Sequence, residues 1–363
     1  MAPAVVTAGL LLALVVSGVV LSEPDWLTPL LAVVIIVIAV MFGARGGFLA
    51  GLIACLAFIS WAVGHDGYDL SDIVNHRVVL FLALGVLTGY FAHGALGDYH
   101  VGQAMARGRI RRAVHNRELI LYYQPVAEAT TGRVIALEAL VRWEHPVHGL
   151  VPPAEFVPLA EGDETTIWEL TLYTLRLAIR ECSEWQKQGY DVGVGVNLST
   201  VTIDREDLID EISRSLAEVG LAPKRLTLEV TESAVMDRPA KVAKALAEVR
   251  SGETAHIAID DFGTGYSSLA RLEQLPVDTL KIDQSFLKRV EEDRRHALLH
   301  SIIGLAHGLG LTACAEGVED VATWETLIGL GCDTVQGYVI SRPMPADEVP
   351  AWLERNLKLA PQT

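Results

Sequence analysis

Several short apolar runs in the second part of the chain end in acidic, amide or lysine side chains, which a buried strand normally avoids. These residues are Glu138, Asn197, Glu229 with Glu232, Asp260 with Asp261, Lys281 with Asp283, Glu316 and Gln336. Isolated carboxylates in a protein interior are costly unless they are paired or bind a cation. Carboxylate and amide oxygens suit Mg²⁺ or Mn²⁺, whereas zinc usually recruits histidine or cysteine. If these side chains converge, they predict an oxygen-rich site for hard divalent cations.

The adjacent Asp260 and Asp261 make that prediction more specific. Neighbouring side chains in a regular strand point to opposite faces, so both can reach one site only where the strand breaks into a loop. The sequence FGTG directly after them supplies such a break. One aspartate could then bridge two cations while the other binds the second. Because two metals clamp the attacking and leaving oxygens of an in-line displacement at phosphorus, the predicted chemistry is phosphodiester hydrolysis.

The elements that must position these residues begin near residue 118, where β-rich runs alternate with amphipathic helical stretches. The predicted strands are ELILYYQPV, RVIALEALVRW, VGVGVNLS, RLTLEVTE, HIAIDDFG, DTLKID, LTACAEGV and DTVQGYVI. The predicted helices are 164–188, 206–219, 238–250, 293–309 and 320–330. Such alternation favours parallel strands, and eight strands within 115–363 fit an α/β fold, a (β/α)₈ TIM-like barrel of about 250 residues.

A doubly wound open sheet is the main alternative fold. An open sheet would spread the polar strand ends along a line, whereas a barrel gathers them at one mouth. Active sites of such barrels collect at the C-terminal ends of the strands. Convergence at one mouth explains all the polar placements together, so we favour the barrel.

The first hundred residues have a different composition. They contain six acids and two bases, leaving 39 acids and 27 bases for the rest of a chain whose net charge is −16. A bilayer core of about 30 Å needs about 20 apolar residues per helix. Four uncharged stretches reach that length and predict an all-α, four-helix transmembrane region: 1–22, 26–44, 46–65 and 78–97.

The loops between these stretches predict the orientation. Those after the first and third stretches are mainly acidic, and the arginine-rich sequence RGRIRRAVHNR follows the fourth. Positive residues stay on the cytoplasmic side, so we expect both termini inside. A cleaved signal peptide is disfavoured because a basic leading segment is missing, and nucleic-acid binding because the chain is acidic. No charged residue lies within the spans, which argues against a transporter.

The strand-end motifs closely resemble those of the EAL family of cyclic-di-GMP phosphodiesterases. They occur in order over 115–355 as YYQP, EALVRW, NLS, EVTES, DDFGTGYSSL, KIDQSF, AEGVE and QGYVISRPMP. Any one of these short motifs would be weak, but eight ordered blocks are specific. The resemblance implies a barrel enzyme that opens cyclic di-GMP to the linear dinucleotide pGpG with Mg²⁺ or Mn²⁺, two ions per site.

The resemblance also implies roles for individual residues. The residues that would ligate one metal are Glu138, Asn197, Glu229 and Asp260, with Asp260 bridging to a second metal held by Asp261. Lys281 and Glu316 would position and deprotonate the attacking water. Glu232 would brace the loop that begins at Asp261, and Arg142 would pair with a substrate phosphate. The remaining candidates for substrate contacts are Gln124, Asp283, Glu319 and Gln336.

The predicted organisation is a transmembrane anchor or sensor over 1–97, a basic linker over 98–117 and an EAL domain over 118–358. The leading hypothesis is an enzyme in the bacterial inner membrane that degrades cyclic di-GMP on the cytoplasmic side. The runner-up is a membrane receptor that binds cyclic di-GMP without turnover. A homodimer through the EAL domain is possible in this family, and we expect no DNA or RNA partner. The sequence leaves the signal sensed by the spans unidentified.

Overall fold

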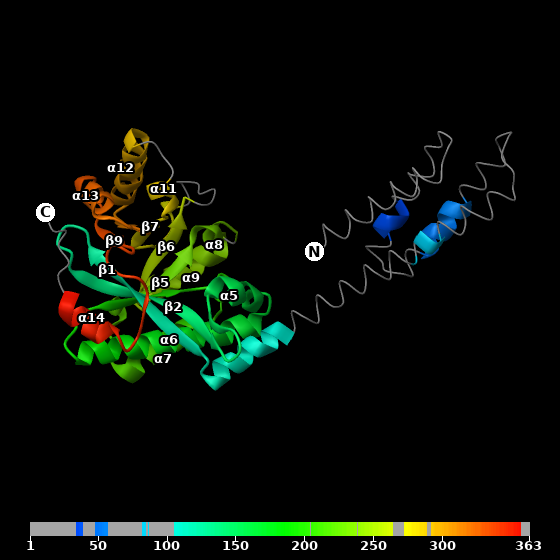
Figure 1. The fold of residues 1–363 in the computed structure, drawn as a ribbon, viewed down its shortest axis with the longest axis horizontal. Coiled ribbons are helices and arrows are strands. Elements are labelled where there is room, and N and C mark those ends of the chain that lie inside the picture. The colour runs from blue at the N-terminus through cyan, green and yellow to red at the C-terminus, as the bar shows by residue number, and fades with distance from the viewer. Residues whose placement is uncertain are drawn as a thin grey trace. The chain divides into compact units, whose positions relative to one another are not determined.

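Residues 106–363 form one of two compact units, and the other comprises Met1–Met105. A computed structural model describes 34–38, 48–56, 82–84, 86, 105–203, 205–237, 239–263, 272–288 and 292–356. Figure 1 shows the ribbon, coloured along the chain.

Eight strands of the second unit close into a barrel. The described residues contain these eight and two short additional strands: β1 (Leu119–Glu128), β2 (Val134–His145), β3 (Gly149–Val151), β4 (Gly193–Asn197), β5 (Leu226–Thr231), β6 (His256–Phe262), β7 (Thr279–Ile282), β8 (Thr312–Ala315), β9 (Thr334–Gln336) and β10 (Met344–Pro345). The order around the barrel is β1-β9-β8-β7-β6-β5-β4-β2, and β2 pairs back with β1. The short strands β3 and β10 extend β2 and β1 outside the ring. The predicted TIM-like barrel is therefore confirmed, and the open sheet is excluded.

The first strand departs from the predicted all-parallel arrangement. The pairings from β2 through β4 to β9 are parallel, but β1 runs antiparallel to both of its neighbours, β2 and β9. The cause is local: only five residues, 129–133, separate β1 from β2, and so short a connection makes a hairpin rather than a crossover. This register places Gln124 beside Glu138 and Val126 beside Gln336.

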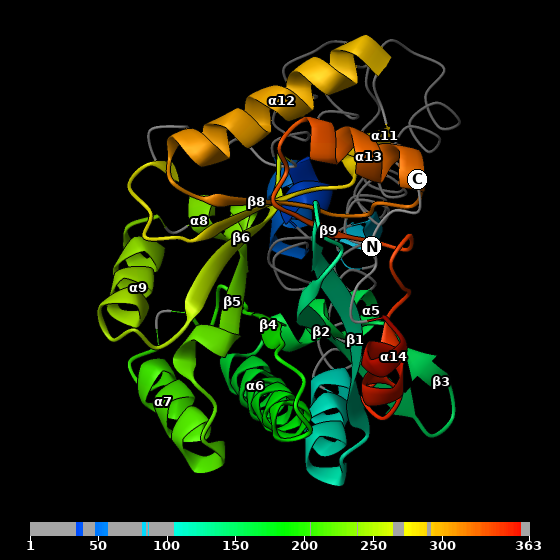
Figure 2. The same cartoon turned by 90° about the vertical axis from the view of Figure 1, so that its left-hand side faces the viewer.

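Helices cover the outside of the strands, as Figure 2 shows for α6, α7, α9 and α12. The helices are α5 (Pro153–Glu161), α6 (Glu164–Lys187), α7 (Leu208–Val219), α8 (Glu232–Asp237), α9 (Pro239–Ser251), α11 (Ser285–Lys288), α12 (Glu292–Gly308), α13 (Val321–Gly329) and α14 (Val349–Asn356), with a 3₁₀ turn at Pro223–Arg225. All five predicted helices occur. The sequence reading missed α5, α8, α11 and α14, which are short.

Side-chain caps fix the starts of two of the predicted helices. Asp163 accepts a hydrogen bond from the backbone N–H of Thr166 at 2.9 Å and so begins α6. Asp320 accepts from the N–H of Thr323 at 2.7 Å and begins α13. Each carboxylate satisfies an N–H that the first helical turn would otherwise leave unpaired.

A further helix, residues 105–116, precedes β1 and packs beside the barrel. Its Ile110 and Ala113 are buried in a small apolar cluster with Phe156 of α5 and Leu170 of α6. Arg107 donates a hydrogen bond to the carbonyl of Leu159 at 3.2 Å. The predicted linker 98–117 therefore includes a helix that is part of the folded barrel unit.

The four predicted spans lie mostly outside the described residues. The parts that are described, 34–38, 48–56, 82–84 and 86, are helical. In this described portion of the chain, no helix combines the length and the hydropathy needed to cross a bilayer.

Candidate active site

Lys281 occupies the centre of a buried carboxylate cluster inside the barrel. It lies on β7, is 3% exposed and its Nζ contacts Glu229. The same Nζ lies 2.6 Å from Glu316 Oε1, 3.2 Å from Asp260 Oδ1 and 3.4 Å from Glu138 Oε2. Four carboxylates thus share one ammonium, so the cluster holds more negative charge than Lys281 can neutralise.

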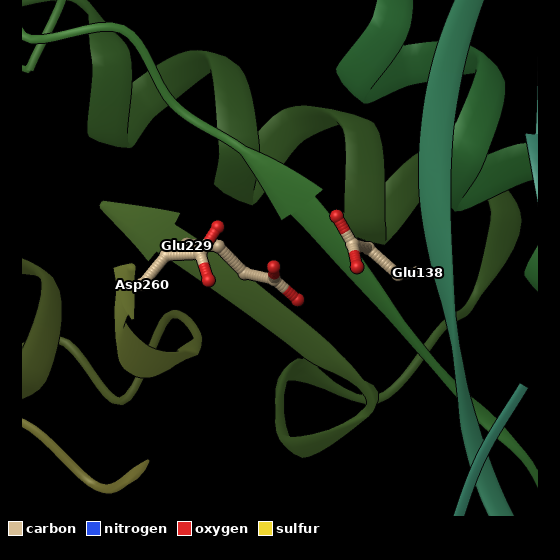
Figure 3. A group of neighbouring side chains, drawn as sticks. All are labelled: Glu138, Glu229 and Asp260. Carbon is tan, nitrogen blue, oxygen red and sulfur yellow. The ribbon is translucent and has the colours of Figure 1, made fainter. Parts of the chain in front are cut away.

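Figure 3 shows Glu138, Glu229 and Asp260 gathered in one space from strands β2, β5 and β6. A carboxylate oxygen from each lies within 4.8 Å of the others, the spacing that a single cation could bridge. Asp260 also belongs to a second group of the same spacing with Asp261 and Glu316. Two adjacent oxygen-rich groups sharing one aspartate form the arrangement predicted for a pair of hard cations.

Two amide side chains orient Glu138. Asn197 Nδ2 donates to Glu138 Oε1 at 2.8 Å, and Gln336 Nε2 donates to Glu138 Oε2 at 2.7 Å. Burial acts to raise the pKa of Glu138, but the charge of Lys281 and these hydrogen bonds outweigh it, so the pKa is lowered. Glu138 is therefore held as a carboxylate. Asn197 and Gln336, on β4 and β9, were both predicted site residues and both lie in contact with it.

The other carboxylates have raised pKa values. Burial, with the charges of Glu138 and Asp260, raises the pKa of Glu229 well above its usual value despite Lys281. Burial raises the pKa of Glu316 to about 8. Burial and the neighbouring Asp260 and Asp283 raise the pKa of Asp261. A bound divalent cation would favour the charged forms of these crowded carboxylates, which agrees with the donor chemistry of the site.

Asp261 reaches the site through a local distortion of β6. Its φ is +55°, in the left-handed region that few residues other than glycine adopt. The strand register shifts between Ile259 and Phe262, and the Asp261 N–H donates to Asp260 Oδ1 at 3.0 Å. The break expected after Asp260 is therefore present. The predicted loop continues into 264–271, which lies outside the described residues.

Glu232 stands at the base of that loop. It is 1% exposed and is the first residue of α8, one position beyond the end of β5, rather than the strand end that was predicted. Its Oε2 accepts a hydrogen bond from the Gly263 N–H at 2.5 Å. This contact ties the backbone after Asp261 and Phe262 to the first residue of α8.

A cavity of about 320 Å³ opens beside the cluster. Its walls include the predicted substrate contacts Gln124, Asp283, Glu319 and Gln336 together with Glu138, Asp261 and Glu316. Arg142 does not line this cavity. It lies four residues beyond Glu138 on β2, and its Nη1 donates a hydrogen bond to the carbonyl oxygen of Val141 at 2.9 Å. The structure therefore places four of the five predicted substrate contacts in one cavity and Arg142 outside it.

Sequence reasoning missed residues that shape the site without carrying charge. A Cβ on Gly195 of β4 would lie 2.1 Å from Glu229 Oε1, so any larger residue would force that carboxylate to move. Gln284 and Tyr338 line the cavity and were not predicted. A Cβ on Gly317 would lie 2.4 Å from Gln284 Cβ. The alternating glycines of GVGVN were the only available signal for Gly195.

Comparison with known proteins gives the family. The model of the EAL domain matches residues 107–343. The chain belongs to the EAL domain family. Among curated relatives, the bifunctional diguanylate cyclase/cyclic di-GMP phosphodiesterase MucR of Pseudomonas aeruginosa is 41% identical over 242 residues, 66% of this chain and 35% of MucR. The oxygen sensor protein DosP of Escherichia coli is 38% identical over 252 residues, 69% of this chain and 31% of DosP.

Solved structures agree with the fold. The structure described as the PaMucR phosphodiesterase, c-di-GMP complex, has a TM-score of 0.63 and 39% identity, covering 68% of this chain and 99% of that one. The EAL enzyme Bd1971, in a form bound to cAMP and cyclic di-GMP, has a TM-score of 0.66 and 29% identity, covering 78% and 77%. The chain spans about a third of the length of the curated relatives MucR and DosP.

Proposed function

We propose that this EAL domain hydrolyses cyclic di-GMP to pGpG with the help of two Mg²⁺ or Mn²⁺ ions. The observation that carries the proposal is the pair of carboxylate groups that share Asp260 directly beside Lys281. MucR, named as a cyclic di-GMP phosphodiesterase and solved in complex with c-di-GMP, supports the choice of substrate. A domain that only bound the dinucleotide would not need two metal-binding groups.

The residues that would hold the ions are Glu138, Asn197, Glu229 and Asp260 for one and Asp260 with Asp261 for the other. When bound, the ions would polarise the phosphodiester and stabilise the charge that develops on its oxygens. Asn197 contributes its side-chain amide from β4. The contact of its nitrogen with Glu138 fixes that carboxylate in place.

The protein's own groups would manage the attacking water. Glu316 would accept its proton, because its carboxylate lines the cavity and lies next to Asp260 and Asp261. Lys281, 2.6 Å from Glu316 Oε1, would hold that carboxylate toward the reacting phosphorus. The water oxygen would form a bond to phosphorus as the P–O3′ bond breaks, and the departing O3′ would gain a proton. Gln124, Asp283, Glu319 and Gln336 would line the nucleotide's cavity, and Arg142 would reach a phosphate from farther along β2.

The test is incubation of the purified full-length chain with cyclic di-GMP and Mg²⁺ or Mn²⁺, followed by chromatography for pGpG. We expect pGpG to accumulate with either ion and to be absent with a chelator. Binding of cyclic di-GMP without any product would overturn the proposed hydrolysis and favour a receptor.

We also propose that residues 1–97 attach the enzyme to the bacterial inner membrane with the EAL domain in the cytoplasm. Four long uncharged stretches followed by an arginine-rich segment support this proposal. A cysteine-labelling assay on intact cells and on inverted vesicles would test it. Labelling of a cysteine introduced near residue 360 in intact cells would contradict the proposed orientation.

A further inference from the structure

A second cavity, of about 440 Å³, is lined by none of the residues of the carboxylate cluster. It is formed between the helix 105–116 with its following residue and helix α6. Its lining residues, which we call the basic pocket, are Val114, His115, Arg117, Glu169, Leu172, Tyr173, Arg176, Leu177 and Arg180. No step of the proposed hydrolysis uses any of them.

The charges of the basic pocket do not balance. Glu169 is its only acidic residue, and that carboxylate already accepts two hydrogen bonds from Arg111, at 3.2 and 3.0 Å. Arg176 pairs with Glu211. Arg117 and Arg180 have no carboxylate within salt-bridge distance among the described residues, and both side chains are exposed at the pocket.

The two unpaired arginines line the same cavity as Tyr173. Burial raises the pKa of Tyr173, and the charges of Arg180 and Arg117 act in the opposite direction. The Tyr173 hydroxyl donates to the carbonyl of Leu119 at 2.8 Å, which fixes the ring in the pocket wall. The charge of Glu181 also acts on Tyr173, and the Glu181 carboxylate accepts a hydrogen bond from Tyr123.

Helix geometry concentrates the charge further. Arg176 and Arg180 lie four residues apart on α6, so they face the same side and repel each other. Arg117 has a φ of +60°, an uncommon conformation that turns the chain out of helix 105–116 into β1 beside the pocket. A bound anion would relieve the repulsion and give Arg117 and Arg180 the partner they lack.

We propose that the basic pocket binds a phosphate-bearing anion. The planar guanidinium donates paired hydrogen bonds that match phosphate oxygens, and two such groups without an ionic partner among the described residues line this cavity. The apolar floor of Val114, Leu172 and Leu177 would accept a short hydrocarbon portion attached to the phosphate. The phosphate could belong to a lipid headgroup or be free in solution, and the experiment separates these sources.

The test is isothermal titration of the full-length chain, in a neutral detergent, with three probes. These are inorganic phosphate, the anionic short-chain lipid dihexanoyl phosphatidylglycerol and its zwitterionic counterpart dihexanoyl phosphatidylcholine. The variant is the double substitution Arg117→Asn and Arg180→Gln, in which asparagine keeps the left-handed backbone at 117. The matched control is Arg355→Gln, because Arg355 is an exposed arginine on α14.

We expect the double variant to bind the anionic probe at least tenfold more weakly, while Arg355→Gln binds it like the unmodified chain. Binding of inorganic phosphate that is lost in the double variant would identify a free phosphate as the ligand. Saturable binding of phosphatidylglycerol alone, lost in the same variant, would identify a lipid headgroup. Failure of both anions to bind, or equal binding by the double variant with a normal melting curve, would overturn the proposal.

Discussion

The barrel mouth, which holds the carboxylate cluster around Lys281, carries excess negative charge, and the basic pocket carries excess positive charge. The two regions differ in how far these charges are buried and paired. At the mouth, Glu138, Glu229 and Lys281 are between 3% and 7% exposed and are held by direct contacts. At the pocket, Arg117 and Arg180 are exposed and have no ionic partner among the described residues. The excess negative charge is therefore buried, whereas the excess positive charge lies at the surface.

Exposure to solvent explains why excess charge has different effects in the two regions. Buried charges interact strongly because the local dielectric is low, so the pKa values of Glu229 and Glu316 at the mouth are raised. Exposed arginines keep their charge at little cost because water screens them. A buried imbalance can activate a bound group for chemistry, whereas an exposed one can only attract a ligand. This contrast predicts large effects from changes at the mouth and graded effects elsewhere.

The largest expected effect comes from Asp260→Asn. This change removes the one carboxylate shared by both metal-binding groups while keeping its size. Changes that only support a metal ligand reduce activity by about 10- to 100-fold, so losing a shared ligand should reduce pGpG formation by more than about 100-fold. The control is Asp191→Asn at the exposed surface, where Asp191 pairs with Arg225. A wild-type rate for Asp260→Asn would refute the assignment of the mouth as a metal site.

Lys281→Met should have the largest effect on stability. It leaves the carboxylates of Glu138, Glu229 and Glu316 buried without their cation. Removing one partner of a buried ion pair costs roughly 3 to 5 kcal/mol, which corresponds to about 10 °C in melting temperature for a domain of this size. We expect that loss in the presence of a chelator and a partial recovery when Mg²⁺ or Mn²⁺ is added.

The control for this stability measurement is Lys187→Met. Lys187 pairs with Glu184 on the exposed face of α6, where ion pairs contribute little. If both lysine variants melted at the same temperature in chelator, the contrast between buried and exposed charge would not hold for this protein.

The pH dependence of stability tests the protonation of Glu316. Its pKa is about 4.5 when unfolded and about 8 when folded, so between these values the folded protein binds more protons than the unfolded chain. Stability without metal should therefore decrease as pH rises from about 4.5 to about 8. Glu316→Gln should flatten this part of the melting-temperature profile. The melting-temperature gain from added Mn²⁺ should increase with pH over the same range, because the ion competes with protons for the site.

The fold could be predicted because its signals are local. Each of the eight strands was a short apolar run with a turn or helix after it. The antiparallel β1 was missed because alternation of strands and helices was applied to the whole chain, although no helix separates β1 from β2. The short helices α8 and α11 were missed because so few residues carry no periodic pattern.

The charged residues of the site could be predicted from the sequence. Polar residues at the ends of apolar runs revealed Glu138, Asp260 and Lys281, which the barrel brings together. Steric requirements left no such signal. The need for glycine at 195 arises from the Glu229 carboxylate on a neighbouring strand, and that contact depends on strand register rather than on neighbours in sequence.

The smallest expected effects come from adding one methyl group at the barrel mouth and one beside the basic pocket. At the mouth, Gly195→Ala would place a Cβ 2.1 Å from Glu229 Oε1 and force that carboxylate to move. In helix 105–116, which forms the wall of the basic pocket, a Cβ on Gly108 meets nothing within 4 Å. Gly108→Ala should therefore raise the free energy of unfolding by about 0.5 to 1 kcal/mol through helix propensity alone.

Gly195→Ala should reduce the rate of pGpG formation by roughly tenfold, because a displaced ligand weakens metal binding without removing it. Higher Mn²⁺ concentration should recover part of that rate, and steady-state assays across a Mn²⁺ titration would measure the recovery. A Gly195→Ala enzyme with normal activity and an unchanged Mn²⁺ requirement would show that Glu229 can move freely. The mouth would then be adaptable in the same way as the exposed pocket, and burial would not be what fixes its geometry.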